Sequence, residues 1–170
     1  IFSEILSNEL IINEICDLLD YNYENIEFLP KPVELGTDSP LELHCTYTRD
    51  QVFAALGHYT LMEKPARGSR EGVLYLEDQS TDVFFITLNK TEEHYSPTTM
   101  YRDYAVSEKL FHWQSQSTTS ESSPTGKRYI NHEKIGNSIL LFVREFKKVD
   151  NKAEPYMFLG PAKYLSHEGS

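Results

Sequence analysis

Apolar residues near the start of the chain recur at the spacing of an α-helix, with acidic side chains between them. The pattern over residues 3–20 predicts an amphipathic helix with Ser3 as its N-cap, and residues 21–28 are expected to form a second short helix. We expect the apolar side to pack on the rest of the chain or on a neighbouring domain of a longer parent protein. The pattern consists of Ile5, Leu6, Leu10, Ile11, Ile12, Ile15, Leu18 and Leu19.

After residue 40 the pattern changes to the alternation and short apolar runs that are typical of β-strands. Thr48 is placed to cap a helix that Gly57 closes, and Pro124 is placed to start another short helix. The expected fold class is α+β: a small, mostly antiparallel, closed or half-closed β-barrel with peripheral short helices and an N-terminal helical arm, because closure removes exposed strand edges. Strands are predicted over residues 41–48, 72–78, 82–90, 101–107, 109–116, 137–148 and 156–168.

Charge divides the chain into unequal parts. Residues 1–42 hold ten acids and one base, a balance of −9, so residues 43–170 carry only −1 of the total of −10. The predicted organisation is an acidic helical arm (1–30), a proline-containing linker (31–40) and a β-barrel recognition domain (41–170). Because the barrel is nearly neutral, net charge neither supports nor excludes its binding to DNA.

Composition favours a reduced, intracellular protein. No apolar run approaches the roughly 20 residues that cross a bilayer, and the acidic start lacks the order of a signal peptide. The two cysteines, Cys16 and Cys45, stand alone without a CxxC spacing. We therefore expect a cytoplasmic protein without membrane contact, and the initial Ile1 indicates a piece of a longer chain.

The sequence offers little support for a catalytic or metal centre. The six histidines show no HxxxH or HxH pairing, and no serine lies in GxSxG. Glu77, Asp78, Asp82 and Lys90 weakly resemble the acid–strand–lysine order of Mg²⁺-dependent nucleases, but turn chemistry explains Glu77 and Asp78 better. We expect no catalytic residue, no cofactor and no metal, so the chain is predicted not to be an enzyme.

Residues 94–132 are unusual in placing six aromatic residues among hydroxyls, amides and a few cations. Aromatic rings stack on nucleic-acid bases, and amides and cations bind base edges and phosphates, so the segment favours a recognition surface. Alternation puts Phe111 and Trp113 on one strand face, and two alternatives stay open: Trp113 packs in the core, or it lines a pocket. The six aromatic residues are Tyr95, Tyr101, Tyr104, Phe111, Trp113 and Tyr129.

At these residues the chain resembles a known bacterial family. The string DVFFITLNKTEEHYSPTTMYRDYAVSEKLFHWQSQSTTSESSPTGKRYINH, followed by ILLFVRE and PYMFLGPAKYLSHEGS, is similar to domain of unknown function 3427. That domain stands at the C-terminal end of large superfamily II helicase-like proteins, which often carry a phospholipase-D-type nuclease domain. The resemblance therefore implies helicase and nuclease domains in the same parent chain as partners. No GxxxxGK[ST] motif lies in this sequence, so ATP hydrolysis would belong to another part of the parent.

The arrangement around FLGPAKYLSHE also looks like the PUA-like barrels that include SRA domains, which bind modified bases in DNA. Together these resemblances imply a non-catalytic domain that recognises DNA, modified or structurally distinct, for a bacterial defence or restriction helicase–nuclease. Tyr95, Tyr101, Tyr104 and Trp113 would stack on bases or line the pocket; Asn89, Gln114, Ser115 and Gln116 would bind base edges; Arg102, Lys127 and Arg128 would hold phosphates.

Two alternatives stay open beside this hypothesis. The chain could be a docking module of the parent helicase, with the acidic helix of residues 3–20 as the contact. The less favoured alternative is an Mg²⁺-dependent nuclease that uses Asp82 and Lys90.

Overall fold

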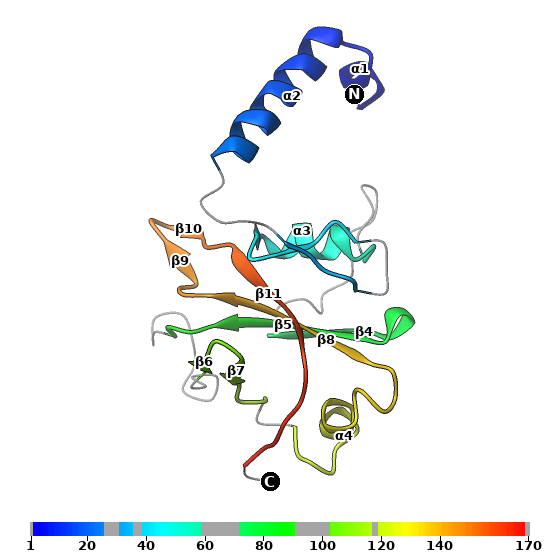
Figure 1. The fold of residues 1–170 in the computed structure, drawn as a ribbon, viewed down its shortest axis with the longest axis vertical. Helices are drawn as coiled ribbons and strands as arrows, with labels where there is room; N and C mark the ends of the chain where they lie inside the picture. Colours follow the sequence, from blue (N-terminus) through cyan, green and yellow to red (C-terminus); the bar gives the residue numbers. More distant parts are fainter. Residues whose placement is uncertain are drawn as a thin grey trace.

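The computed structural model describes residues 2–25, 31–35, 39–58, 72–90, 103–116 and 119–168. Its fold class is α+β, as the sequence predicts: a five-stranded mixed sheet with short helices, preceded by two N-terminal helices (Figure 1).

The N-terminal arm consists of α1 (Phe2–Leu6) and α2 (Glu9–Glu24). The helix predicted over residues 3–20 is interrupted because the side chain of Asn8 caps α2, accepting the backbone N–H groups of Leu10 and Ile11 at 3.2 and 3.3 Å. The predicted start of a second helix at Tyr21 is wrong, since α2 continues to Glu24. No residue of α2 is buried, so the arm does not pack on the described part of the sheet.

The main sheet has the strand order β3-β11-β8-β5-β4. Three of its neighbouring pairs are antiparallel, whereas β5 and β8 are parallel and are joined by a long crossover. Within the described residues the edge strands β3 and β4 do not pair, so the sheet is open and the expected barrel is not confirmed. The strands are β3 (Thr46–Tyr47), β4 (Val73–Leu76), β5 (Thr81–Thr87), β8 (Ser138–Arg144) and β11 (Tyr156–Ala162).

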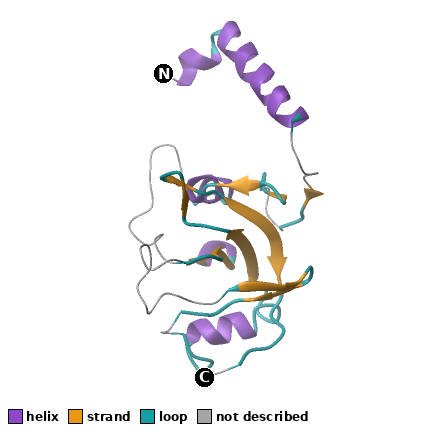
Figure 2. Ribbon diagram, turned by 90° about the vertical axis from the view of Figure 1, so that its left-hand side faces the viewer, coloured by secondary structure: helices purple, strands orange, loops and turns teal. Residues whose placement is uncertain are grey.

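Every residue of β5 is buried, because both faces of the sheet are covered. One face packs on α3 (Arg49–Ala55), where Phe53 and Phe85 meet edge to face with ring centroids 5.6 Å apart. The other face packs on α4 (Pro124–Ile130), where Tyr129 meets Phe84 at 5.2 Å. The two helices lie on opposite sides of the curved sheet (Figure 2).

Local capping signals place both helices where the sequence predicts them. Thr48 and Gln51 form a reciprocal capping box at the start of α3, and Gly57, with a φ of +68°, follows its end. Pro124 occupies the first turn of α4, and the side chain of Ser123 accepts the N–H of Gly126 at 3.0 Å.

Positive φ angles explain where the predicted strands break. His44, with a φ of 70°, divides the predicted strand 41–48 into β2 (Glu42–Leu43) and β3. β2 pairs with β1 (Lys31–Pro32), in the segment expected to be a linker. Gly160, whose φ of +102° suits glycine, produces a bulge within β11, and β11 ends at Ala162, before the end of the predicted strand 156–168.

Two smaller hairpins complete the fold. The predicted strands around residues 101–116 form an antiparallel pair, β6 (Tyr104–Ser107) and β7 (Leu110–His112). β9 (Lys148–Val149) and β10 (Lys152–Ala153) are joined by Asp150 and Asn151, both with positive φ, in the tight turn that such residues favour. The short 3-10 turn η1 (Glu77–Gln79) connects β4 to β5, as the sequence predicts.

Candidate nucleic-acid interface

The ends of β5 and β8 form one end of the sheet, and the two small hairpins lie there (Figure 1). Beyond β5 the pairing with β8 continues: the N–H of Asn89 donates to the carbonyl of Glu145 at 2.8 Å. The side-chain amide of Asn89 also donates to the Glu145 carboxylate at 3.3 Å. Asn89, a predicted site residue, is exposed and is fixed beside the start of the β9–β10 hairpin.

A buried ion pair fixes the β6–β7 hairpin to the same end of the sheet. The ammonium of Lys90 lies 2.7 Å from one carboxylate oxygen of Asp103, and the two side chains are 9% and 2% exposed. The other oxygen accepts the backbone N–H of Gln114 at 2.8 Å. One carboxylate therefore joins the end of β5 to both strands of the hairpin. No local sequence pattern predicts this link, because Lys90 and Asp103 are 13 residues apart.

The solvent side of the β6–β7 hairpin carries two stacked rings. Tyr104 and His112 are directly opposite each other, with ring centroids 4.9 Å apart and planes inclined by 28°. Tyr104 is 52% exposed. Phe111, on the other side of the hairpin, packs against the core. The hairpin is thus anchored on one side and presents flat aromatic surface on the other, which is the geometry that base stacking requires.

Trp113 packs against the core, one of the two alternatives that the sequence left open. Its ring centroid lies 4.2 Å from that of Phe84 and 5.6 Å from that of Tyr129. Because Phe84 covers one face of the indole, Trp113 supports the hairpin and bridges it to α4.

The remaining predicted polar residues follow directly after Trp113. Gln114 is exposed, and Ser115 and Gln116 are half-buried. The Asp103 contact to Gln114 fixes the start of this run close to Tyr104. Tyr95, Tyr101 and Arg102, which the sequence also assigns to the site, lie outside the described residues.

Arg128, a predicted phosphate ligand, binds Asp82 instead. Its Nε and Nη2 donate to the two carboxylate oxygens at 2.8 and 2.9 Å, and the guanidinium lies 3.8 Å from the ring centroid of Tyr75. The hydrogen bond to Asp82 is the main reason that the pKa of Arg128 is raised above its ordinary value. Two of its three guanidinium nitrogens are therefore engaged in holding α4 on the sheet.

The Asp82 carboxylate, fully buried, begins a chain of hydrogen bonds that reaches the C-terminal segment. The side-chain amide of Asn137 donates to it at 2.9 Å, and the Asn137 carbonyl lies 3.1 Å from Nδ1 of His132. The Nε2 of His132 accepts the N–H of Tyr164 at 3.0 Å, so the imidazole proton is assigned to Nδ1. This network is not among the predictions from the sequence. Its signal was an acid at the start of an otherwise apolar strand.

Asp82 and Lys90, the two residues of the nuclease alternative, lie far apart and bind different partners. Asp82 lies at the start of β5 and Lys90 beyond its end, so the eight residue steps between them span up to about 26 Å at roughly 3.3 Å per residue. Each is paired with a different partner, Arg128 or Asp103. The described residues contain no group of three or more His, Cys, Asp or Glu side chains that could hold a metal ion.

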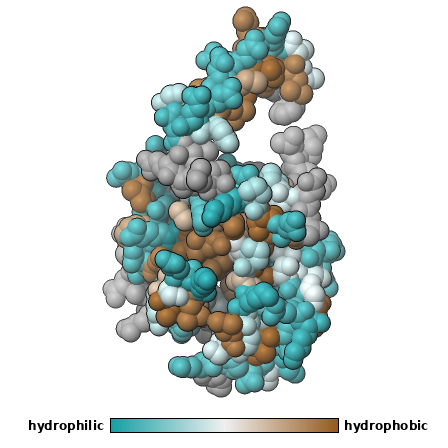
Figure 3. Space-filling view, in the orientation of Figure 1, coloured by the Kyte–Doolittle hydropathy of each residue, from teal (hydrophilic) through white to brown (hydrophobic). Residues whose placement is uncertain are grey.

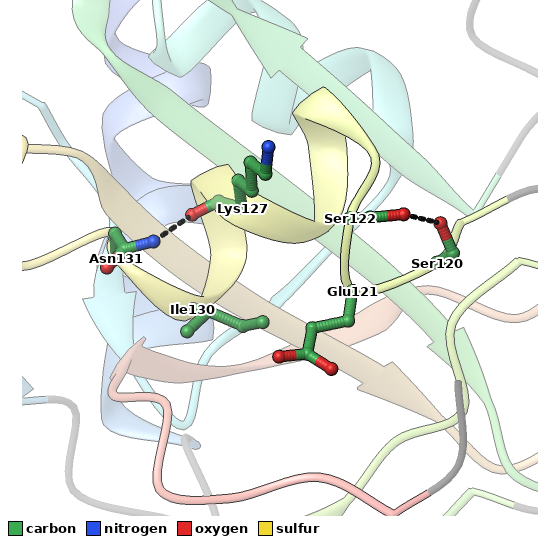
Figure 4. A pocket seen from close by; sticks show the side chains of 6 residues that line it. All are labelled: Ser120, Glu121, Ser122, Lys127, Ile130 and Asn131. Atoms are coloured by element: carbon green, nitrogen blue, oxygen red, sulfur yellow. Dashed lines mark hydrogen bonds between the residues drawn. The ribbon is translucent and has the colours of Figure 1, made fainter.

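Lys127 lies beside an open hollow of about 490 Å³ on the outer side of α4 (Figure 4). The carbonyl of Lys127 accepts the side-chain amide of Asn131 at 2.9 Å. Five of the six lining residues are polar and none is buried, so the hollow has the character of a surface contact rather than of an enclosed ligand site. It is lined by Ser120, Glu121, Ser122, Lys127, Ile130 and Asn131.

Comparison with protein-family models matches residues 41–170 to domain of unknown function 3427 (DUF3427). The chain belongs to this family. The DUF3427 match includes the whole sheet and both small hairpins, and it leaves out the helical arm. No curated protein and no solved structure matches the chain significantly. No helix in the described parts of this DUF3427 protein is long and apolar enough to cross a membrane.

Proposed function

We propose that this chain is a non-catalytic DNA-recognition domain that directs a bacterial defence or restriction helicase–nuclease to modified or structurally distinct DNA. One observation carries the proposal: the exposed, stacked rings of Tyr104 and His112 on a hairpin that the Lys90–Asp103 ion pair anchors. Base–aromatic stacking contributes about 1–3 kcal/mol per base, and a fixed platform orders few groups on binding.

The polar neighbours of the platform supply contacts that distinguish bases. Asn89 and Gln114 carry amides, which both donate and accept hydrogen bonds at base edges. Ser115 and Gln116 follow in the same run. Tyr95, Tyr101 and Arg102 retain the stacking and phosphate-binding roles that the sequence predicts for them.

The cations of α4 divide into two roles. Lys127, exposed on the surface of α4, holds a phosphate. Arg128 acts through its bond to Asp82, which fixes α4 and thereby the position of Lys127.

The resemblance to PUA-like barrels with SRA domains extends the proposal to base flipping. A base extruded from the duplex would stack on Tyr104 and be bound at its edge by Gln114. Mismatched or damaged bases leave the helix at lower free-energy cost, which gives one source of selectivity.

Fluorescence anisotropy with plain, methylated, glucosylated and phosphorothioate duplexes tests the proposal on the full 170-residue chain. We expect binding at low salt and a preference for one of the altered duplexes. Tyr104→Ala is expected to weaken binding by about 1–3 kcal/mol through lost stacking. Tyr23→Ala is the matched control, because Tyr23 is an exposed tyrosine on α2. Absence of binding to all four duplexes would refute the proposed function, and equal effects of the two variants would refute the role of Tyr104.

The exposed side chains of the arm favour a second candidate, a docking module of the parent protein. Apolar residues of α1 and α2 are open to solvent (Figure 3), and clusters of this kind mark interaction sites. Deleting residues 2–25 would abolish association with the parent helicase and leave DNA binding unchanged if the arm is the docking element. The exposed apolar residues are Leu6, Leu10, Ile11, Ile15, Leu18 and Leu19.

A further inference from the structure

The β9–β10 hairpin presents two lysines that neither the sequence analysis nor the proposed site includes. Lys148 on β9 is paired with Ala153, and Lys152 on β10 is paired with Val149. Both lysines are exposed, and neither forms an ion pair with a described residue. Because successive residues of a strand alternate between its two faces, Lys148 and Lys152 extend from opposite faces of the hairpin, on either side of the tight turn at Asp150 and Asn151.

The start of this hairpin is fixed by contacts that also occupy Glu154, the acid that follows β10; the acid of the turn, Asp150, forms no ion pair with a described residue. Arg144 donates from Nε to the hydroxyl of Thr87 at 2.9 Å and from Nη1 to the carbonyl of Glu154 at 3.1 Å, with its guanidinium over the ring of Tyr156. The carboxylate of Glu154 accepts the backbone N–H of Phe146. Glu154 is thereby held at the start of the hairpin, away from an ion pair with either lysine.

Two consecutive residues after β5, Asn89 and Lys90, bind the segments that lead into the two hairpins. Asn89 is bonded to Glu145, just before β9, and Lys90 is bonded to Asp103, just before β6. The pair of lysines and the pair of rings therefore lie on neighbouring projections from the same end of the sheet (Figure 1). Rings stack on bases, whereas lysines neutralise phosphates, so the two projections have complementary chemistry for one nucleic-acid ligand.

We infer that the β9–β10 hairpin is a second DNA contact, in which Lys148 and Lys152 hold backbone phosphates while the β6–β7 hairpin contacts bases. This inference rests on the proposed function. Phosphate contacts carry no information about sequence or base modification. The lysines therefore set affinity and its salt dependence, and the selectivity for altered DNA is left to the β6–β7 hairpin.

The salt dependence of binding tests the inference. The double variant Lys148→Gln/Lys152→Gln is compared with the unaltered full chain on a plain and an altered duplex, between about 50 and 200 mM salt. Each lost phosphate contact lowers the slope of log K against log salt concentration by about 0.9, so the double variant should lower it by about 2 on both duplexes. The ratio of the two affinities should stay unchanged, and so should the melting temperature, because both side chains are exposed.

Lys163→Gln is the matched control for loss of positive charge. Lys163 is 74% exposed and binds Glu133 at 2.7 Å, an ion pair that lowers the pKa of Glu133 through hydrogen bonding and charge. It follows β11, away from both hairpins, so its loss should leave the slope unchanged. An unchanged slope in the double variant would overturn the inference while the proposed function stands, and an equal effect of Lys163→Gln would overturn it as well. Absence of DNA binding by the unaltered chain would refute both proposals.

Discussion

Replacing Arg128 with methionine removes the cation that neutralises a fully buried carboxylate. Asp82 accepts two hydrogen bonds from Arg128 and one from Asn137, so the variant leaves it with one donor and no counter-charge. Breaking a buried ion pair in this way costs about 3–5 kcal/mol. Because the Arg128 side chain is 19% exposed, water can approach the vacated position, and we expect about 3 kcal/mol, the lower end of that range.

Urea unfolding followed by circular dichroism measures this cost directly. A loss of about 3 kcal/mol corresponds to a fall in melting temperature of about 10 °C for a domain of this size. The double variant Asp82→Leu/Arg128→Met removes both charges, and we expect it to be more stable than Arg128→Met alone. A cost below about 1 kcal/mol for Arg128→Met, or a double variant as unstable as the sum of the single changes, would refute the reasoning.

Below its melting temperature, Arg128→Met should leave the salt dependence of DNA binding unchanged, because the guanidinium binds Asp82 rather than a phosphate.

Two further variants test how the β6–β7 hairpin is held. Asp103→Asn should leave the ammonium of Lys90 without its carboxylate, and faster hydrogen exchange of the Gln114 amide would report a loosened hairpin. Trp113→Ala should lower the free energy of unfolding, measured in urea, by about 3 kcal/mol. Truncation of a buried aromatic residue costs about 3–5 kcal/mol, and Trp113 is only half-buried. A stability within about 0.5 kcal/mol of the original would place Trp113 outside the core.

Elements with a local signal could be predicted from the sequence. The helix cap at Thr48, the turn at Glu77 and Asp78 and the apolar run of β8 each depend on residues close in sequence, and each is observed. The sheet order could not be predicted in the same way. The parallel pairing of β5 with β8 joins Thr81 to Ser138 across a long crossover, and short-range periodicity carries no information about such pairs. The barrel was expected from antiparallel neighbours alone, and this parallel pair was not part of that expectation.

Part of the candidate site could likewise be predicted from the sequence, and part could not. Composition was sufficient to single out Tyr104 and Gln114, because rings and amides in one segment are visible without a structure. Composition could not show which cations are already paired. Arg128 and Asp82 are 46 residues apart, so the commitment of Arg128 to a buried acid becomes visible only in the fold. Lys148 and Lys152 are not predicted as site residues, because Lys148 ends the predicted strand 137–148 and Lys152 follows it, both outside the aromatic segment of residues 94–132.

The distribution of charge allows the arm and the sheet to bind different partners. The described arm carries six acids and no base, so charge repulsion opposes its binding to a polyanion such as DNA, and a basic protein surface has the complementary charge. The hairpins at the end of the sheet combine lysines with exposed rings, and this combination suits a nucleic acid. Screening limits the influence of the arm on DNA to about 8 Å at physiological salt. Docking through the arm and DNA binding at the sheet are therefore compatible in one parent protein. The net charge of −10 is no argument against DNA binding at the sheet. The six acids are Glu4, Glu9, Glu14, Asp17, Asp20 and Glu24.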